Sequence, residues 1–146
     1  MRHSVIKRIK SYLKFILPAF LSIVLVAVIS IFFPAHISDS NAVRIDATPT
    51  TSHSIQITIS NNSSSVITFP NDYHIEVNSI LGWRKLASLS SSFTSLGHSI
   101  TPGESSSFFI DYEPIYGTLS PGEYRFVKEV IIADESAYFA GYFSVK

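Results

Sequence analysis

An apolar stretch near the N-terminus restricts what this chain can be. Residues 15–35 are twenty-one consecutive residues without a charge, and Ser22 and Ser30 are their only polar side chains. A helix of this length spans about 30 Å, the thickness of the hydrocarbon core of a bilayer. A buried helix of a soluble protein rarely stays apolar on every face for so long. We therefore expect residues 15–35 to form one transmembrane helix that acts as a signal anchor.

The charges on either side of this stretch predict its orientation. Residues 1–14 contain five basic residues and no acid, and Lys and Arg are retained on the cytoplasmic side of a membrane. We expect a basic cytoplasmic tail at residues 1–14, a polar spacer at residues 36–42 and an exported C-terminal domain, in a single-pass protein of the cell membrane. A cleaved signal peptide is the alternative, because a small-x-small cleavage site ends at Ala42. Both alternatives export the domain.

Composition excludes several classes of site. The chain has no cysteine, which excludes disulfides, thiolate metal ligands, cysteine nucleophiles and a lipidated cysteine. Its zero net charge is the sum of two opposite halves, because all eleven acids lie in residues 38–146 against six basic residues there. An acidic domain lacks the clustered Lys and Arg that neutralise phosphates, so we expect no nucleic acid among its partners.

The exported part has the period-two alternation of β-strands. Ile55, Ile57 and Ile59, for example, alternate with polar residues. Comparable runs recur at intervals near 8–12 residues, and no helical period follows Ala35. The expected strands are residues 43–47, 55–59, 66–69, 73–77, 83–89, 107–112, 123–132 and 138–145. This pattern predicts an all-β, immunoglobulin-like antiparallel β-sandwich of seven to eight strands over residues 43–146.

Two Pro-Gly turns stand just before predicted strands, at residues 101–104 and 120–123. Proline fixes the φ of the second turn position and glycine supplies a positive φ at the third, so both are predicted to be type II turns. The second turn leads into Tyr124, and residues 119–124 have the form of a tyrosine corner. We expect the Tyr124 hydroxyl to be buried and to bond to the backbone a few residues upstream.

Residues 54–130 resemble the bacterial immunoglobulin-like domains of exported Gram-positive proteins. The matching residues are turn and core positions: Asn61-Asn62-Ser63, Tyr73 with Glu76, Trp83 with Leu86, Pro102-Gly103, Tyr116-Gly117, and Leu119 to Arg125 with Lys128. The resemblance implies a fold and no chemistry, and it supplies no catalytic residues. Many members of that family follow a lipoprotein signal, which this cysteine-free chain lacks, so the helix itself must provide the anchor.

Asp72, His74 and Glu76 are the strongest candidate metal ligands. Their alternate positions place them on one face of a strand, and histidine with carboxylates suits zinc. No second strand offers a matching ligand, so we interpret them as a solvated polar face opposite Tyr73 and Ile75 and predict no metal site.

Other polar residues offer weaker candidates. Serine is abundant in residues 88–95, but no nucleophile elbow is present, so we interpret this run as a polar edge and loop. His98 adjoins Ser99 in sequence, which is not how catalytic triads are built. We expect His53 and His98 to be exposed. Weak calcium sites in loops (Asp111 with Glu113, and Asp134 with Glu135) and two Asn-x-Ser sequons (Asn61 and Asn62) remain open.

Aromatic residues are the remaining candidates. We expect Trp83, the single tryptophan, to pack between the sheets, the alternative being an exposed ring that binds sugar or membrane. Neighbours in a strand point to opposite faces, so only one residue of each aromatic pair can face the core. The pairs are Phe108-Phe109, Tyr138-Phe139 and Tyr142-Phe143. Their outward members are candidates for an exposed apolar patch.

Together these observations predict a non-enzymatic, membrane-anchored, extracytoplasmic immunoglobulin-like module. Its expected role is binding or structural, at the bacterial cell envelope, with a protein or the cell wall as partner. The sequence predicts no catalytic, cofactor-binding or metal-binding residue. A cleaved, secreted, soluble binding or inhibitory sandwich is the alternative. A small hydrolase is a distant third, because it needs paired titratable groups in a polar cleft, which the sequence does not indicate.

Overall fold

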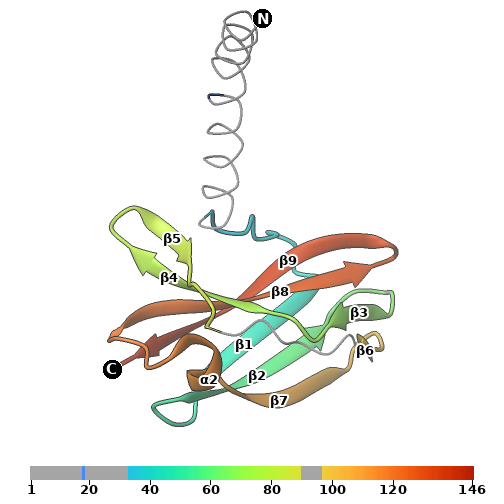
Figure 1. Cartoon of the computed structure of the whole chain (residues 1–146). Helices are drawn as coiled ribbons and strands as arrows, with labels where there is room; N and C mark the ends of the chain where they lie inside the picture. The colour runs from blue at the N-terminus through green and yellow to red at the C-terminus, as the bar shows by residue number, and fades with distance from the viewer. Residues whose placement is uncertain (1–17, 19–32, 90–96) are drawn as a thin grey trace, which may run out of the picture. The chain divides into compact units, whose positions relative to one another are not determined.

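The computed structural model describes Pro18, residues 33–89 and residues 97–146. The chain divides into two units, Met1–Phe33 and Pro34–Lys146, and the second contains the β-sandwich (Figure 1). Most of the predicted membrane segment lies outside the described residues. Its last three residues, 33–35, are not helical, so the prediction of a helix to residue 35 is wrong at its C-terminal end. The part of the chain that is described contains no helix long and apolar enough to span a bilayer.

Two antiparallel sheets form the second unit. The first has three strands in the order β1-β2-β7: β1 (Val43–Pro49), β2 (Ser54–Asn61) and β7 (Ser105–Asp111). The second has six: β3 (Ile67–Pro70), β4 (His74–Ser79), β5 (Gly82–Lys85), β6 (Gly97–Ile100), β8 (Gly122–Ile132) and β9 (Glu135–Val145). The described residues thus contain nine strands. The prediction of an antiparallel all-β sandwich is confirmed, with one or two strands more than expected.

Strand β8 organises the six-stranded sheet. It pairs with β9 along its whole length, from Gly122 opposite Val145 to Ile132 opposite Glu135. On its other side it pairs first with β4 and then with β3. Ala133 and Asp134 join β8 to β9 with φ values of 49° and 68°, the left-handed conformation that suits a tight hairpin between right-twisted strands.

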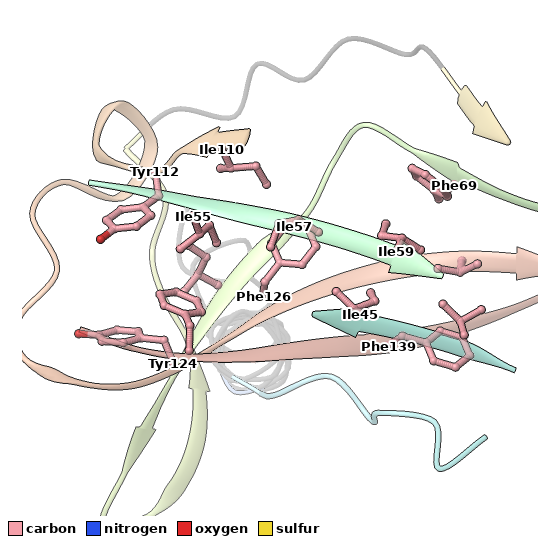
Figure 2. Packing of buried hydrophobic residues seen from close by; sticks show 14 of the residues in the cluster. Ile45, Ile55, Ile57, Ile59, Phe69, Ile110, Tyr112, Tyr124, Phe126 and Phe139 are labelled. Atoms are coloured by element: carbon pink, nitrogen blue, oxygen red, sulfur yellow. The ribbon is translucent and has the colours of Figure 1, made fainter. Parts of the chain in front are cut away.

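The core lies between the two sheets and follows the predicted alternation. Ile55, Ile57 and Ile59 of β2 are fully buried, and their polar neighbours face outward. They pack in one cluster with Phe126 of β8 and Phe139 of β9 (Figure 2). Burying one such aliphatic side chain contributes roughly 1.5–3 kcal/mol, so this face is a main source of stability.

The two Pro-Gly turns differ. Gly103 has a φ of 80°, and the Glu104 N–H donates to the Thr101 carbonyl at 3.1 Å, so the first type II turn is confirmed. Gly122 has no positive φ, because it is already the first residue of strand β8. The prediction of a type II turn at residues 120–123 is therefore wrong.

Two elements were not predicted. Strand β6 carries exposed Gly97, His98 and Ser99 and a single buried residue, Ile100, which is too little for a period-two signal. Helix α2 (Glu113–Tyr116) is a single turn with Pro114 in its first positions, too short to show a helical period. Strand β5 is also shorter than predicted, because it ends at Lys85.

Candidate functional site

The outer face of the six-stranded sheet carries a polar and aromatic cluster. Strand register places Lys85, Glu76, Arg125 and Tyr142 in one row across β5, β4, β8 and β9. Trp83 lies opposite Asn78, two residues along β4 from Glu76, and so belongs to the same face. Period-two alternation thus brings one acid, two basic residues and two aromatic rings together on the side away from the core.

A buried ion pair forms the centre of this cluster. Glu76 has no exposed surface and Arg125 has 6% exposed. The Arg125 guanidinium donates from Nε (2.8 Å) and Nη2 (2.5 Å) to Oε2 of Glu76. Hydrogen bonds between charged groups are stronger than neutral ones, but desolvation offsets much of their gain. Removal of one partner is costly because it leaves a buried charge uncompensated.

The second oxygen of Glu76 is also fully used. Its Oε1 accepts hydrogen bonds from the backbone N–H of Ala35 at 2.7 Å and from Nε2 of His74 at 3.0 Å. Burial by itself raises the pKa of Glu76, but the hydrogen bonds from His74, Ala35 and Arg125 outweigh it and hold the pKa below its ordinary value. Glu76 is therefore a carboxylate in the folded protein.

Aromatic rings and a stretch of backbone cover the ion pair. The guanidinium carbon of Arg125 lies 4.7 Å from the centroid of the Trp83 ring, a cation–π contact. Trp83 in turn meets Tyr142 edge-on at 5.6 Å. Trp83 is half-buried and lies on the outer face, so the prediction that it packs between the sheets is wrong. Its contact with a buried arginine accounts for its position.

The backbone that covers the pair is the chain's own segment at residues 34–38, which we call the strap. Besides the Ala35 N–H bond to Glu76, the Ala35 carbonyl accepts from Arg125 Nη2 at 3.3 Å. Ile37 forms a parallel bridge with Tyr138 of β9, and the Ser38 N–H donates to the Tyr138 carbonyl at 2.8 Å. The first part of the predicted spacer is thus fixed to the sheet.

The candidate metal ligands do not form a site. Asp72 precedes β4, and its carbonyl accepts a hydrogen bond from Lys128 Nζ at 2.7 Å. The interpretation of Asp72, His74 and Glu76 as a solvated face is wrong, because Glu76 is fully buried beneath the strap. Within the described ranges, no three His, Asp or Glu side chains are grouped so that they could hold a metal ion. Sequence reasoning missed the role of Arg125, whose partner follows only from the register.

The other candidate residues lie apart from one another. His53 and His98 are exposed, as predicted: His53 Nδ1 lies 3.4 Å from Glu113 Oε2, and His98 bonds to Asn71 Oδ1 at 2.6 Å. The residues suggested for weak calcium binding lie in exposed or partly exposed loops and strand ends: Asp111, Glu113, Asp134 and Glu135. Of the serine run, residues 90–96 lie outside the described residues, and Ser88 is exposed.

The first sequon has a structural role. Asn61 is fully buried, and its amide donates to the carbonyls of Ser65 (2.8 Å) and Ile100 (2.9 Å). Its Oδ1 accepts from the N–H and the hydroxyl of Ser63. A side chain bonded in this way is not accessible to a glycosylating enzyme, whereas Asn62 is exposed.

The aromatic pairs alternate as predicted. Phe139 and Phe143 are 4% exposed, whereas their neighbours Tyr138 and Tyr142 are 39% and 57% exposed. Phe109 is 69% exposed, but it lies on the three-stranded sheet. The outward members therefore lie on different sheets and do not form one patch.

A second buried charge lies between the sheets. Lys128 of β8 is 2% exposed and shares the inner face with Phe126 and Val130. Its ammonium nitrogen lies 5.4 Å from the Phe69 ring centroid. Burial lowers the pKa of Lys128 to about 8, although the charge of Asp72 opposes the shift. Lys128 adjoins a cavity of about 290 Å³ that is also lined by Phe69, His98 and Phe108.

The tyrosine corner is present. The Tyr124 side chain is 4% exposed, and its hydroxyl donates to the Ser120 carbonyl at 2.6 Å. Tyr112 makes a comparable bond to the Ser52 carbonyl at 2.7 Å and is 2% exposed. The first of these anchors was predicted from its Leu-x-x-x-x-Tyr context, and the second has no local sequence signal.

These features define an antiparallel β-sandwich with a tyrosine corner. The sequence matches the family described as Bacterial Ig-like domain over residues 40–143, and the chain belongs to this family. The resemblance inferred from residues 54–130 is thus confirmed. Among solved structures, the archaellum periplasmic stator protein FlaG from Sulfolobus acidocaldarius is similar at 17% identity and a TM-score of 0.42, covering 69% of this chain and 97% of that one. No curated protein matches the chain.

Proposed function

We propose that this chain is a membrane-anchored, extracytoplasmic immunoglobulin-like module with a non-enzymatic binding or structural role at the bacterial cell envelope. The family and the sandwich fold support an exported module. The uncharged stretch within residues 15–35 and the five basic residues before it support an anchor with a cytoplasmic N-terminus. A protein or the cell wall is the expected partner.

The strap is the observation that carries the proposal. Both carboxylate oxygens of Glu76 accept hydrogen bonds from groups of this chain. The backbone of Ala35 is held by two hydrogen bonds, one from its N–H to Glu76 and one from Arg125 to its carbonyl. The strap begins with the last two residues of the apolar stretch, Pro34 and Ala35, and continues directly from it in sequence. A buried charged pair that fixes the start of the domain suits a module whose orientation to an anchor matters, which favours a structural or presenting role.

The same geometry weighs against the alternative of a cleaved, secreted domain. Cleavage after Ala42 removes the strap and uncovers Glu76 and Arg125, which the folded domain keeps buried. It also removes the Ala42 carbonyl, which accepts the Asn62 N–H at 2.8 Å next to the start of β1. We therefore infer that the strap stays with the domain.

Two measurements test this proposal. Mass spectrometry of the protein from isolated membranes is expected to find residues 1–14 still attached, and a mature N-terminus at residue 43 contradicts the anchor. Protease added to intact protoplasts is expected to degrade residues 38–146 and spare the basic tail, and protection of the domain contradicts its export. Crosslinking in the native envelope then identifies what the domain contacts.

A further inference from the structure

The hairpin between β4 and β5 presents two aliphatic side chains to solvent. Ile80 and Leu81 form its two-residue tip and are 101% and 93% exposed. The tip is well defined: the Ser79 hydroxyl bonds to the Gly82 carbonyl at 2.7 Å and accepts the Leu81 N–H at 3.3 Å, and Gly82 has a φ of 94°. A tight turn is ordinarily built from polar residues and glycine, so two fully exposed aliphatic residues here need an explanation.

The hairpin also extends beyond the rest of its sheet (Figure 1). Pairing of β4 with β8 ends at Val77, and β5 pairs with β4 alone. Residues 78–82 therefore form the end of a two-stranded ribbon that pairs with no third strand, and Trp83 fixes its base to Arg125 and Tyr142. The tip of the hairpin can therefore pass from water into a less polar environment without moving any residue of the core.

Charge distinguishes this hairpin from the rest of the domain. Arg84 and Lys85 are exposed in β5, separated from the tip by two residues, and no described acid forms an ion pair with either. By contrast, Arg44 pairs with Asp46 and Arg125 with Glu76. A domain with a net charge of −5 thus has a basic hairpin with an apolar tip.

We propose that the tip of the β4–β5 hairpin inserts into the surface of an anionic lipid bilayer. Ile80 and Leu81 enter the boundary between headgroups and acyl chains, and Arg84 and Lys85 contact the lipid phosphates. A convex tip of two residues offers far less area than the roughly 800 Å² per partner of a stable protein interface, whereas a fluid bilayer needs no complementary shape. The inference rests on the proposed function in one respect: it requires that the exported domain lies next to a membrane surface.

The absence of cysteine provides a specific probe. The Leu81→Cys variant of the full chain is labelled with an environment-sensitive fluorophore and mixed with vesicles of phosphatidylcholine alone or with phosphatidylglycerol. Ser106→Cys, an exposed position on β7 of the other sheet, is the matched control. With anionic vesicles we expect a blue-shifted emission at position 81 that brominated lipids quench, and neither effect at position 106. Equal, unquenched emission at both positions overturns the proposal and leaves a protein partner as the explanation of the tip.

A second variant tests the charges. Arg84→Gln with Lys85→Gln, in the labelled Leu81→Cys chain, is expected to weaken the blue shift on anionic vesicles several-fold and to make it insensitive to salt. An unchanged shift overturns the role of the two basic residues. Flotation of the same samples with the vesicles tests the membrane anchor separately. A chain that does not float contradicts the anchor. The fluorescence emission at position 81 tests the hairpin, whatever the result for the anchor. Unchanged thermal unfolding confirms that these exposed substitutions leave the fold intact.

Discussion

The inner face of the six-stranded sheet and the centre of its outer face are both buried, but by different groups. The inner face of β8 presents Tyr124, Phe126 and Val130 to the opposite sheet, where aliphatic side chains cover them. The outer face presents Arg125, which is covered by the strap and by Trp83. Apolar burial tolerates many substitutions of similar volume, whereas a buried ion pair depends on every one of its partners. The outer face is therefore the more sensitive of the two to a single change.

Loss of one charge of the pair is expected to have the largest effect. Arg125→Met keeps most of the side chain's volume but leaves Glu76 buried without its counter-charge, which is expected to cost about 3–5 kcal/mol of unfolding free energy. Denaturant unfolding of residues 34–146, which form one unit with its own core, measures the change. The double variant Glu76→Gln with Arg125→Met is expected to regain part of the loss. A double variant as unstable as Arg125→Met would show that packing, not charge, dominates this face.

Deletion of the strap is the next comparison. A fragment that begins at residue 39 lacks the backbone groups of Ala35 and Ser38 that bond to Glu76, Arg125 and Tyr138. We expect it to unfold with about 1–3 kcal/mol less free energy than residues 34–146, since buried polar groups lose partners. Equal midpoints for the two fragments would remove the main argument against cleavage near Ala42.

The tyrosine corner tests the inner face. Tyr124→Phe keeps the ring but deprives the Ser120 carbonyl of its donor, at an expected cost of about 1–3 kcal/mol. Tyr112→Phe is expected to cost a similar amount, because its hydroxyl bonds to the Ser52 carbonyl. Tyr142→Phe is the control, since Tyr142 is 57% exposed. Denaturant midpoints of the three variants show whether the two buried hydroxyls contribute more to the unfolding free energy than the exposed one does.

The inner face was predictable from the sequence because period-two alternation of isoleucine and aromatic residues leaves one interpretation. Ile55, Ile57 and Ile59 needed no knowledge of their partners to be placed in the core. The tyrosine corner was predictable for a different reason: its hydrogen bond spans only four residues, so the local sequence contains both partners. The short edge strand β6 was not, because one buried residue makes no period.

The outer face was not predictable, because polar residues in alternation ordinarily face water. Glu76 is buried only because Arg125, forty-nine residues away, lies opposite it in the register and Ala35 covers both. Trp83 was misplaced for the same reason: a lone tryptophan in a strand has no local signal for which face it occupies. Long-range pairing, which a single sequence does not show, determines this cluster.

Acid is expected to weaken the outer face selectively. The folded protein holds the pKa of Glu76 below its ordinary value of 4.5, so the stability that this carboxylate contributes is fully present above pH 4.5 and is lost as pH falls through the folded pKa. Denaturant midpoints of the wild type and Glu76→Gln at pH 7 and pH 3 test this. The wild type is expected to lose more stability than the variant between the two pH values. Parallel losses would place the acid sensitivity elsewhere in the domain.

Lys128 is expected to give the smallest effect, in the alkaline range instead of the acid range. Burial lowers its pKa to about 8 from 10.5, so the folded state favours the neutral amine. The unfolded chain then binds more protons than the folded one between these values, and stability rises as pH increases from about 8. Burial also raises the pKa values of three tyrosines, Tyr112, Tyr116 and Tyr124. The stability that depends on their protonated hydroxyls is lost above pH 10, and this loss cancels part of the stability gained through Lys128. A small rise in the denaturant midpoint between pH 8 and 10, absent in Lys128→Met, is the expected result. A flat wild-type profile would mean that the ammonium keeps its proton inside the sandwich, held by the Asp72 carbonyl and the Phe69 ring.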